Sequence, residues 1–153
     1  MAAIESSLGI HPDTYIVDAY QGPAQVGLAE FDAAATPASK ALGIADPYAN
    51  IQAGISYMSA IQARLKKRGI ANPTAGDVYA AYNQGVGDYM KLRNNPDATA
   101  ASVVGLESVI QNIPLNIGAQ ADTITSAEFV VLIKSYPERA YNLNTNHALV
   151  PAS

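Results

Sequence analysis

The sequence predicts an all-α or mostly α fold, built as one domain. About half of the 153 residues are hydrophobic and only 14% are charged, so the chain can bury a sizeable core. Alanine is abundant, and alternating runs of β-branched residues are scarce. Capping residues, prolines at first helical positions and glycines just past helix ends recur along the chain. Together these features favour helices.

In the first part of the chain, the sequence of residues 11–43 predicts a loop followed by a short helix. Residues 11–27, HPDTYIVDAYQGPAQVG, are interrupted by proline and glycine, which is typical of a long ordered loop. Such loops are uncommon unless they have a function. Thr36 and Pro37 then provide a cap and a first helical residue, and Gly43 ends the predicted helix.

The clearest predicted helix begins at Asp46-Pro47 and ends before Gly69. Its apolar positions recur every three or four residues and predict one buried face, made of Ile51, Ile55, Met58, Ile61 and Leu65. Basic residues at 66–68 occupy the last turn, where they complement the negative end of the helix dipole. We interpret them as a solvated helix end rather than a binding patch.

Three further helices are predicted. Thr74 and Asp77 approximate a capping box and begin a helix that ends near Gly85. After a linker at residues 94–99, the apolar periodicity of residues 99–111 predicts one helix, and the TSAE motif at 125–128 begins the last. We therefore predict a catalytic core over residues 1–95, helices completing the same domain over 96–137, and a tail over 138–153.

Composition excludes several classes of function. The net charge of −4, with only nine Lys and Arg residues in the chain, argues against a general nucleic-acid binder. The chain has no cysteine, and its two histidines have no partner at metal-ligand spacing, so no metal or other cofactor is expected. No stretch approaches the length of a membrane span, and no secretion signal is recognisable.

Several short motifs occur in a fixed order between residues 3 and 90. They are Glu5-Ser6, Gly22-Pro23-Ala24-Gln25, Asp46-Pro47-Tyr48-Ala49-Asn50-Ile51, Tyr57-Met58 and Ala81-Tyr82-Asn83-Gln84-Gly85-Val86-Gly87. In order and rough spacing they resemble the soluble lytic transglycosylase (SLT) domain, a branch of the lysozyme-like superfamily. The glutamine after Asn83 is similar to variants carried by tailed-phage virion proteins.

The resemblance implies a lysozyme-like helical fold with a long active-site loop. It also implies cleavage of the bond between N-acetylmuramic acid and N-acetylglucosamine with a 1,6-anhydro product. By match, Glu5 is the catalytic acid and base, and Tyr82 places its hydroxyl near the Glu5 carboxylate. The implied substrate-binding residues are Gln25, Asn83, Tyr20 and Gly22. Tyr15 and Tyr89 are further candidates for stacking on sugars, although tyrosines must also fill this core.

The chain departs from the family pattern around Glu5. The family places about three helical turns before its catalytic glutamate, whereas only Met1 to Ile4 precede Glu5. The segment from Glu5 to Gln25 is about two residues longer than usual. It lacks the serine often found midway, where Thr14 or Asp18 lies.

These departures leave alternatives open. A muramidase would use water and take Asp13 or Asp18 as its second carboxylate. A virion structural domain would keep the fold without activity, and cleavage of peptide cross-links is a third alternative. The resemblance implies a peptidoglycan glycan strand as the partner, together with other virion or secretion-machine proteins. It places the chain in a virion that acts in the bacterial periplasm, or on an export route supplied by a partner machine.

Overall fold

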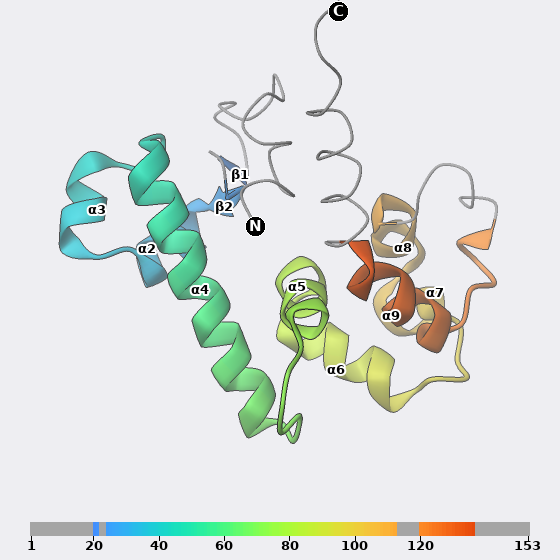
Figure 1. Cartoon of the computed structure of the whole chain (residues 1–153). Helices are drawn as coiled ribbons and strands as arrows, with labels where there is room; N and C mark the ends of the chain where they lie inside the picture. The colour runs from blue at the N-terminus through green and yellow to red at the C-terminus, as the bar shows by residue number, and fades with distance from the viewer. Residues whose placement is uncertain (1–19, 22–23, 113–119, 137–153) are drawn as a thin grey trace, which may run out of the picture. The chain divides into compact units, whose positions relative to one another are not determined.

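The computed structural model describes residues 20–21, 24–112 and 120–136 (Figure 1). This part of the chain is mostly helical, with eight helices and one two-stranded hairpin, which confirms the predicted fold class. The chain divides into two compact units, residues 1–60 with 137–153 and residues 61–136, and the boundary falls inside α4. Among the described residues, no helix combines the length and apolarity needed to cross a membrane.

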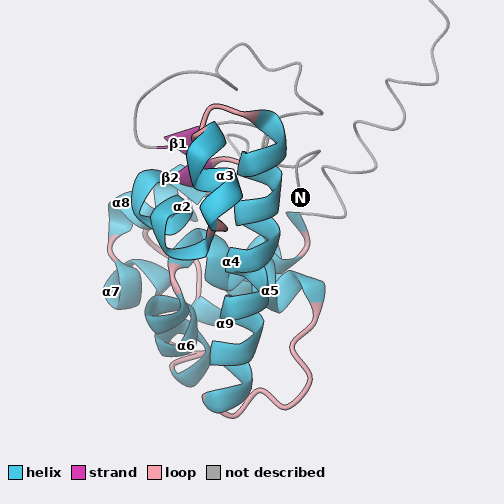
Figure 2. Cartoon of the chain, turned by 90° about the vertical axis from the view of Figure 1, so that its left-hand side faces the viewer, coloured by secondary structure: helices cyan, strands magenta, loops and turns pink. Residues whose placement is uncertain are grey.

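The first unit contains a hairpin and three helical segments (Figure 2). Strands β1 (Tyr20–Gln21) and β2 (Val26–Gly27) pair antiparallel, with Tyr20 opposite Gly27 and Gln21 opposite Val26. The chain continues into α2 (Leu28–Ala34), α3 (Pro37–Leu42) and α4 (Pro47–Lys67). The prediction of a loop throughout residues 11–27 is therefore wrong at the two strands, while residues 11–19 lie outside the described part. Such two-residue strands carry too little periodicity to be recognised in a sequence.

The core of the first unit is built from small side chains. Its buried cluster contains Ala24, Val26, Phe31, Ala49 and Ala53. Helix α4 contributes Ala49 and Ala53 together with Asn50, and all three are fully buried. The predicted apolar face of this helix is therefore wrong in its first half, because Ile51 and Ile55 are exposed. Periodicity favoured the large aliphatic residues, but close packing against the hairpin selects the alanine face.

The second unit contains the end of α4 and five further helices. Ile61 and Leu65 of α4 are buried here, as predicted. The helices are α5 (Ala75–Gln84), α6 (Val86–Asn94), α7 (Ala100–Val104), α8 (Leu106–Asn112) and α9 (Ser126–Lys134). Helices α5, α6 and α9 pack against one another, and α7 packs against α6 and α8. The largest fully buried side chains of the unit include Tyr89, Leu92 and Phe129.

Two features of this unit differ from the predictions. Residues 99–111 form two helices rather than one, because Gly105 has a φ of +90° and interrupts the helix between α7 and α8. Helix α6 was not predicted, since its sequence VGDYMKLRN has no clear apolar stripe. The capping boxes at Thr74/Asp77 and Thr125/Glu128 are confirmed.

Candidate functional site

The hairpin places Gln25 at the end of the connection between its two strands. Ala24 and Val26, the residues on either side, are buried in the core of the first unit, whereas Gln25 is half-buried. Gln25 has a φ of +46°, the left-handed conformation that few residues other than glycine adopt. The two buried neighbours therefore anchor a turn that keeps the glutamine partly accessible.

Asn50 fastens this turn to α4. Its side-chain oxygen accepts a hydrogen bond from the backbone N–H of Ala24 at 2.9 Å, and its Nδ2 donates to the carbonyl of Ile44 at 3.1 Å. The amide is fully buried, so each of these bonds satisfies a group that has no access to solvent. Sequence reasoning assigned Asn50 no role of its own. The available signal was its place in the DPYANI motif, on the same face of the helix as Ala49 and Ala53.

A second group of predicted site residues lies on the last turn of α5. Tyr82 is half-buried, and it follows the fully buried Ala80 and nearly fully buried Ala81. Asn83 is exposed and accepts a hydrogen bond from Nε2 of Gln84 at 2.7 Å, while Oε1 of Gln84 accepts one from Ser108 of α8 at 3.0 Å. Gly85 then ends the helix with a φ of +79°. The AYNQG residues thus form the C-terminal end of α5, and Ser108 of α8 is hydrogen-bonded to it.

A buried charge cluster holds α5 to its neighbours. Asp77, whose side chain is 4% exposed, lies 2.7 Å from Nζ of Lys134 on α9 and 3.2 Å from Nη1 of Arg93 on α6. It also accepts a 2.5 Å hydrogen bond from the hydroxyl of Tyr89. Burial alone would raise the pKa of Asp77, but the hydrogen bonds from Lys134, Tyr89 and Thr74 outweigh it and hold this pKa well below its usual range.

Tyr89 is consequently not a sugar-stacking residue, and that expectation is wrong. Its side chain is fully buried, and its hydroxyl is committed to Asp77. Burial, together with the bond donated to Asp77, raises the pKa of Tyr89 to about 12. The sequence identified Asp77 as part of a helix cap, but it gave no sign that Tyr89, Arg93 and Lys134 converge on the same carboxylate.

The described part of the chain covers the predicted site only in part. Glu5 and Gly22, like the alternative carboxylates Asp13 and Asp18, lie outside the described residues. Tyr20 is placed in β1 by its backbone alone. Gln25 belongs to the first unit, and Tyr82 and Asn83 belong to the second.

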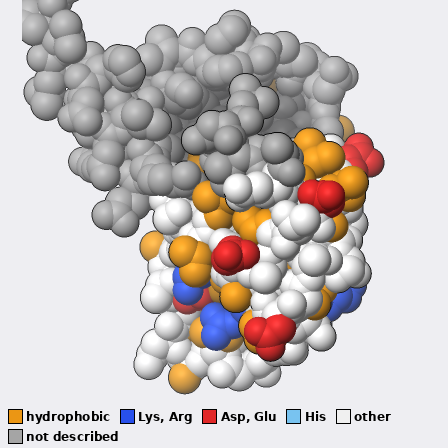
Figure 3. All heavy atoms as spheres, turned by 90° about the vertical axis from the view of Figure 1, so that its right-hand side faces the viewer, with side chains coloured by type: hydrophobic (Ala, Val, Ile, Leu, Met, Phe, Trp, Pro, Cys, Tyr) orange, Lys and Arg blue, Asp and Glu red, His pale blue; other side chains and the backbone are white. Residues whose placement is uncertain are grey.

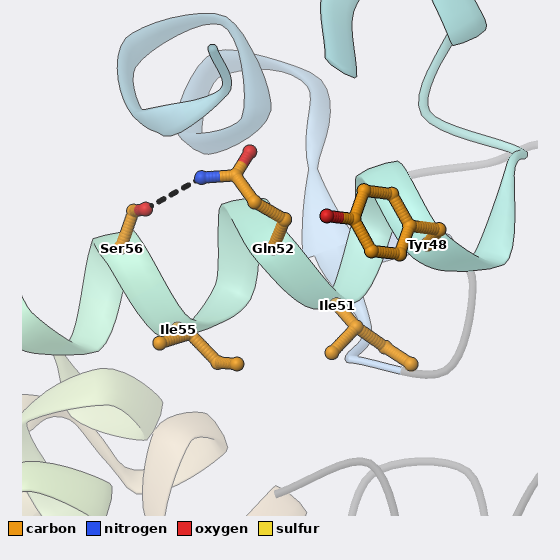
Figure 4. A pocket seen from close by; sticks show the side chains of 5 residues that line it. All are labelled: Tyr48, Ile51, Gln52, Ile55 and Ser56. Carbon is orange, nitrogen blue, oxygen red and sulfur yellow. Dashed lines mark hydrogen bonds between the residues drawn. The ribbon is translucent and has the colours of Figure 1, made fainter. Parts of the chain in front are cut away.

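A separate depression of about 270 Å³ lies along α4 (Figure 4). It is lined by Tyr48, Ile51, Gln52, Ile55 and Ser56 and contains none of the predicted site residues. In Figure 4 the side chains of Gln52 and Ser56 lie together, joined by a hydrogen bond of 2.8 Å, while those of Ile51 and Ile55 lie on another side of the helix. Within the described residues, no group of three or more His, Cys, Asp or Glu side chains could hold a metal ion.

Comparison with known proteins identifies the family. No curated protein and no solved structure matches the chain. The family model of the transglycosylase SLT domain matches residues 19–104, more than half of the chain. The matched segment begins after Glu5 and includes the hairpin with Gln25 and the α5 end with Tyr82 and Asn83. The family indicates lytic transglycosylase activity on peptidoglycan. The chain belongs to the transglycosylase SLT domain family.

Proposed function

We propose that this chain cleaves the β-1,4 bond between N-acetylmuramic acid and N-acetylglucosamine and leaves a 1,6-anhydro end. The observation that carries the proposal is the family match over residues 19–104. Within that segment, the partly accessible Gln25 and Tyr82 stand on rigidly held elements. A side chain that recognises a sugar needs both accessibility and a fixed backbone.

Glu5 is proposed as the one catalytic acid and base. Its protonated carboxyl gives a proton to the glycosidic oxygen as the bond from that oxygen to the anomeric carbon breaks. The resulting carboxylate takes the proton of the muramic C6 hydroxyl, and that oxygen forms the new bond to the anomeric carbon. Protons balance without water, and no second carboxylate is required, in contrast to most glycosidases. The acid works near neutral pH only if burial raises the pKa of its carboxyl.

The remaining predicted residues are assigned supporting roles. The Tyr82 hydroxyl is proposed to orient the Glu5 carboxylate, and Gln25 to bind a sugar. Asn83, Tyr20 and Gly22 are proposed to complete the substrate cleft. The sequence departs most from the family pattern around Glu5, so the role of Glu5 is the point to test first.

The decisive measurement is mass spectrometry of purified murein digested by the protein. We expect 1,6-anhydro ends from the wild type, and a loss of at least about 100-fold in rate for Glu5→Gln. The matched control is Glu107→Gln, the same substitution at an exposed position of α8, which should leave the rate unchanged. Reducing ends would favour a muramidase with Asp13 or Asp18, and released peptides with intact glycan chains would favour cross-link cleavage. Equal rates for wild type and Glu5→Gln would overturn the assignment of Glu5.

We also propose that the chain acts as part of a phage virion that opens the cell wall locally during entry. Its support is the likeness of the AYNQG sequence to phage variants of the motif. The chain should then be found in purified particles, and those particles should clear murein in a gel. Its absence from the particles would favour export by a partner machine.

A further inference from the structure

Gln25 occupies a backbone conformation that must be held from outside the turn. A residue other than glycine in the left-handed region costs on the order of 1 kcal/mol and persists only where the surroundings fix it. Gln25 has this conformation, with a φ of +46°. The contacts that hold this backbone conformation therefore also determine where the Gln25 side chain lies.

The first such feature is the amide of Asn50. Both of its described hydrogen bonds go to backbone groups, the N–H of Ala24 and the carbonyl of Ile44. The bond to Ala24 holds the peptide next to Gln25, and the bond to Ile44 fixes the orientation of the amide. Because this bond is buried, removal of the amide oxygen would cost the Ala24 N–H a hydrogen bond that solvent does not readily replace.

The second feature is Gly54, one helical turn after Asn50 on α4. A Cβ built at Gly54 would lie 2.7 Å from Cβ of Ala24 and 3.5 Å from Cγ2 of Val26. Real Cβ atoms do not approach another carbon that closely, so any larger residue would push the turn away from the helix. Glycine in a helix normally costs stability. Its presence here accords with the space that the turn requires.

We propose that Asn50 and Gly54 are positioning residues that hold the turn of Gln25 in its sugar-binding geometry. Asn50 supplies the directed bond, and Gly54 allows the close approach. They flank the buried Ala53, so one face of α4 forms a seat for the turn between β1 and β2. This inference rests on the proposed function, because it gives Gln25 the role of binding the glycan strand.

A positioning role and a purely structural role predict different kinetics. If the seat acts through Gln25, its loss weakens substrate binding and leaves the chemical step intact, which raises KM at constant kcat. Its effect also disappears once the Gln25 side chain has been removed, because the two changes then affect the same interaction. A seat that only stabilises the fold would produce neither signature at a temperature well below unfolding.

The test is a double-mutant cycle on soluble, uncross-linked glycan strands. We expect Asn50→Ala, Gly54→Ala and Gln25→Ala each to raise KM about tenfold, with kcat within twofold of the wild type. Either variant combined with Gln25→Ala should show no further rise. Thr36→Ala is the matched control, since it removes the N-cap of α3 in the same unit and should lower stability without changing KM. Circular dichroism checks that each variant is folded, and Gly54→Ala tests the seat independently should Asn50→Ala unfold.

The outcomes separate the two proposals. Independent effects that multiply with that of Gln25→Ala, or an unchanged KM in both seat variants, would overturn the positioning role and leave the function standing. An unchanged KM for Gln25→Ala alone would overturn the role of Gln25 and with it that of the seat. A wild type that releases no product from the strands would overturn the proposed function, and the positioning role falls with it.

Discussion

Asp77 shows how one side chain can fix three helices. Its carboxylate accepts from the cap of α5 and from Tyr89 of α6, and it pairs with Lys134 of α9. A buried carboxylate without such partners would be strongly destabilising, because its desolvation would be uncompensated. The side chains of Arg93 and Lys134, which both pair with Asp77, remain about a third exposed and can regain water. Most of the cost of breaking this cluster therefore falls on the carboxylate.

We predict that Asp77→Asn lowers the free energy of unfolding by about 2–3 kcal/mol at pH 7. The folded-state pKa of Asp77 lies below the unfolded value of 3.8, so its stabilisation is complete above that pH and is lost as the pH falls through the folded pKa. Urea unfolding should therefore show a constant difference between wild type and variant down to about pH 5 and a smaller one at pH 3. Asp88→Asn, which removes an exposed pair with Lys91, should cost less than about 1 kcal/mol. Equal costs at the two positions would contradict this account.

Tyr89 provides a spectroscopic test of the same cluster. The raised pKa, about 12, means that its contribution to stability is complete below pH 10 and is lost as the pH rises through 12. Tyrosinate absorbance at high pH should show a difference between wild type and Tyr89→Phe centred near pH 12. The nine tyrosines make the full titration broad, but this difference reports one residue. A difference centred near the ordinary value of 10 would show that the hydroxyl is not held by Asp77.

At the scale of the element, Gly105 decides that residues 100–112 form two helices. Its φ of +90° and ψ of 143° are accessible in practice only to glycine. We predict that Gly105→Ala lowers the free energy of unfolding by about 1–3 kcal/mol. Gly87→Ala is the matched control, because Gly87 lies in α6 at ordinary φ with nothing within 4 Å of an added Cβ, and it should gain up to about 1 kcal/mol. Urea unfolding of both variants measures whether each substitution lowers or raises the free energy of unfolding. An equal decrease for Gly87→Ala and Gly105→Ala would contradict this explanation.

The elements that could be predicted from the sequence are those fixed by local chemistry. Thr36, Thr74 and Thr125 each cap a helix with their own side chain, so a few neighbouring residues contain the whole signal. The buried face of α4 is different, because it depends on what packs against it. Ala49 and Ala53 are buried only because the hairpin lies close, and no pattern within α4 records that contact.

At the scale of the whole molecule, the motifs could be recognised because their order along the chain is visible in the sequence, whereas the contacts between individual residues are not. Residues of the proposed site come from segments more than 50 positions apart, such as Gln25 and Tyr82. Motif order could therefore indicate the family, which the match over residues 19–104 confirms. The seat of Asn50 and Gly54 could not be predicted, because it exists only once α4 and the turn have come together.

The charge of the whole chain leads to the last prediction. The chain carries a net charge of −4, and on the face seen in Figure 3 the described basic side chains are interspersed with acidic ones and form no single positive patch. Murein also carries carboxylates on its peptide stems, so the long-range interaction between enzyme and substrate is repulsive. Salt screens such repulsion over a Debye length of about 10 Å at 0.1 M.

The rate of murein clearing should therefore rise, by about twofold or less, between 20 and 200 mM NaCl. The combined variant Asp32→Asn, Asp97→Asn neutralises two exposed acids, and it should clear faster than wild type at 20 mM with little difference at 200 mM. Turbidity of suspended sacculi measures both rates. A steep fall with salt would instead show that a basic surface steers the chain to murein.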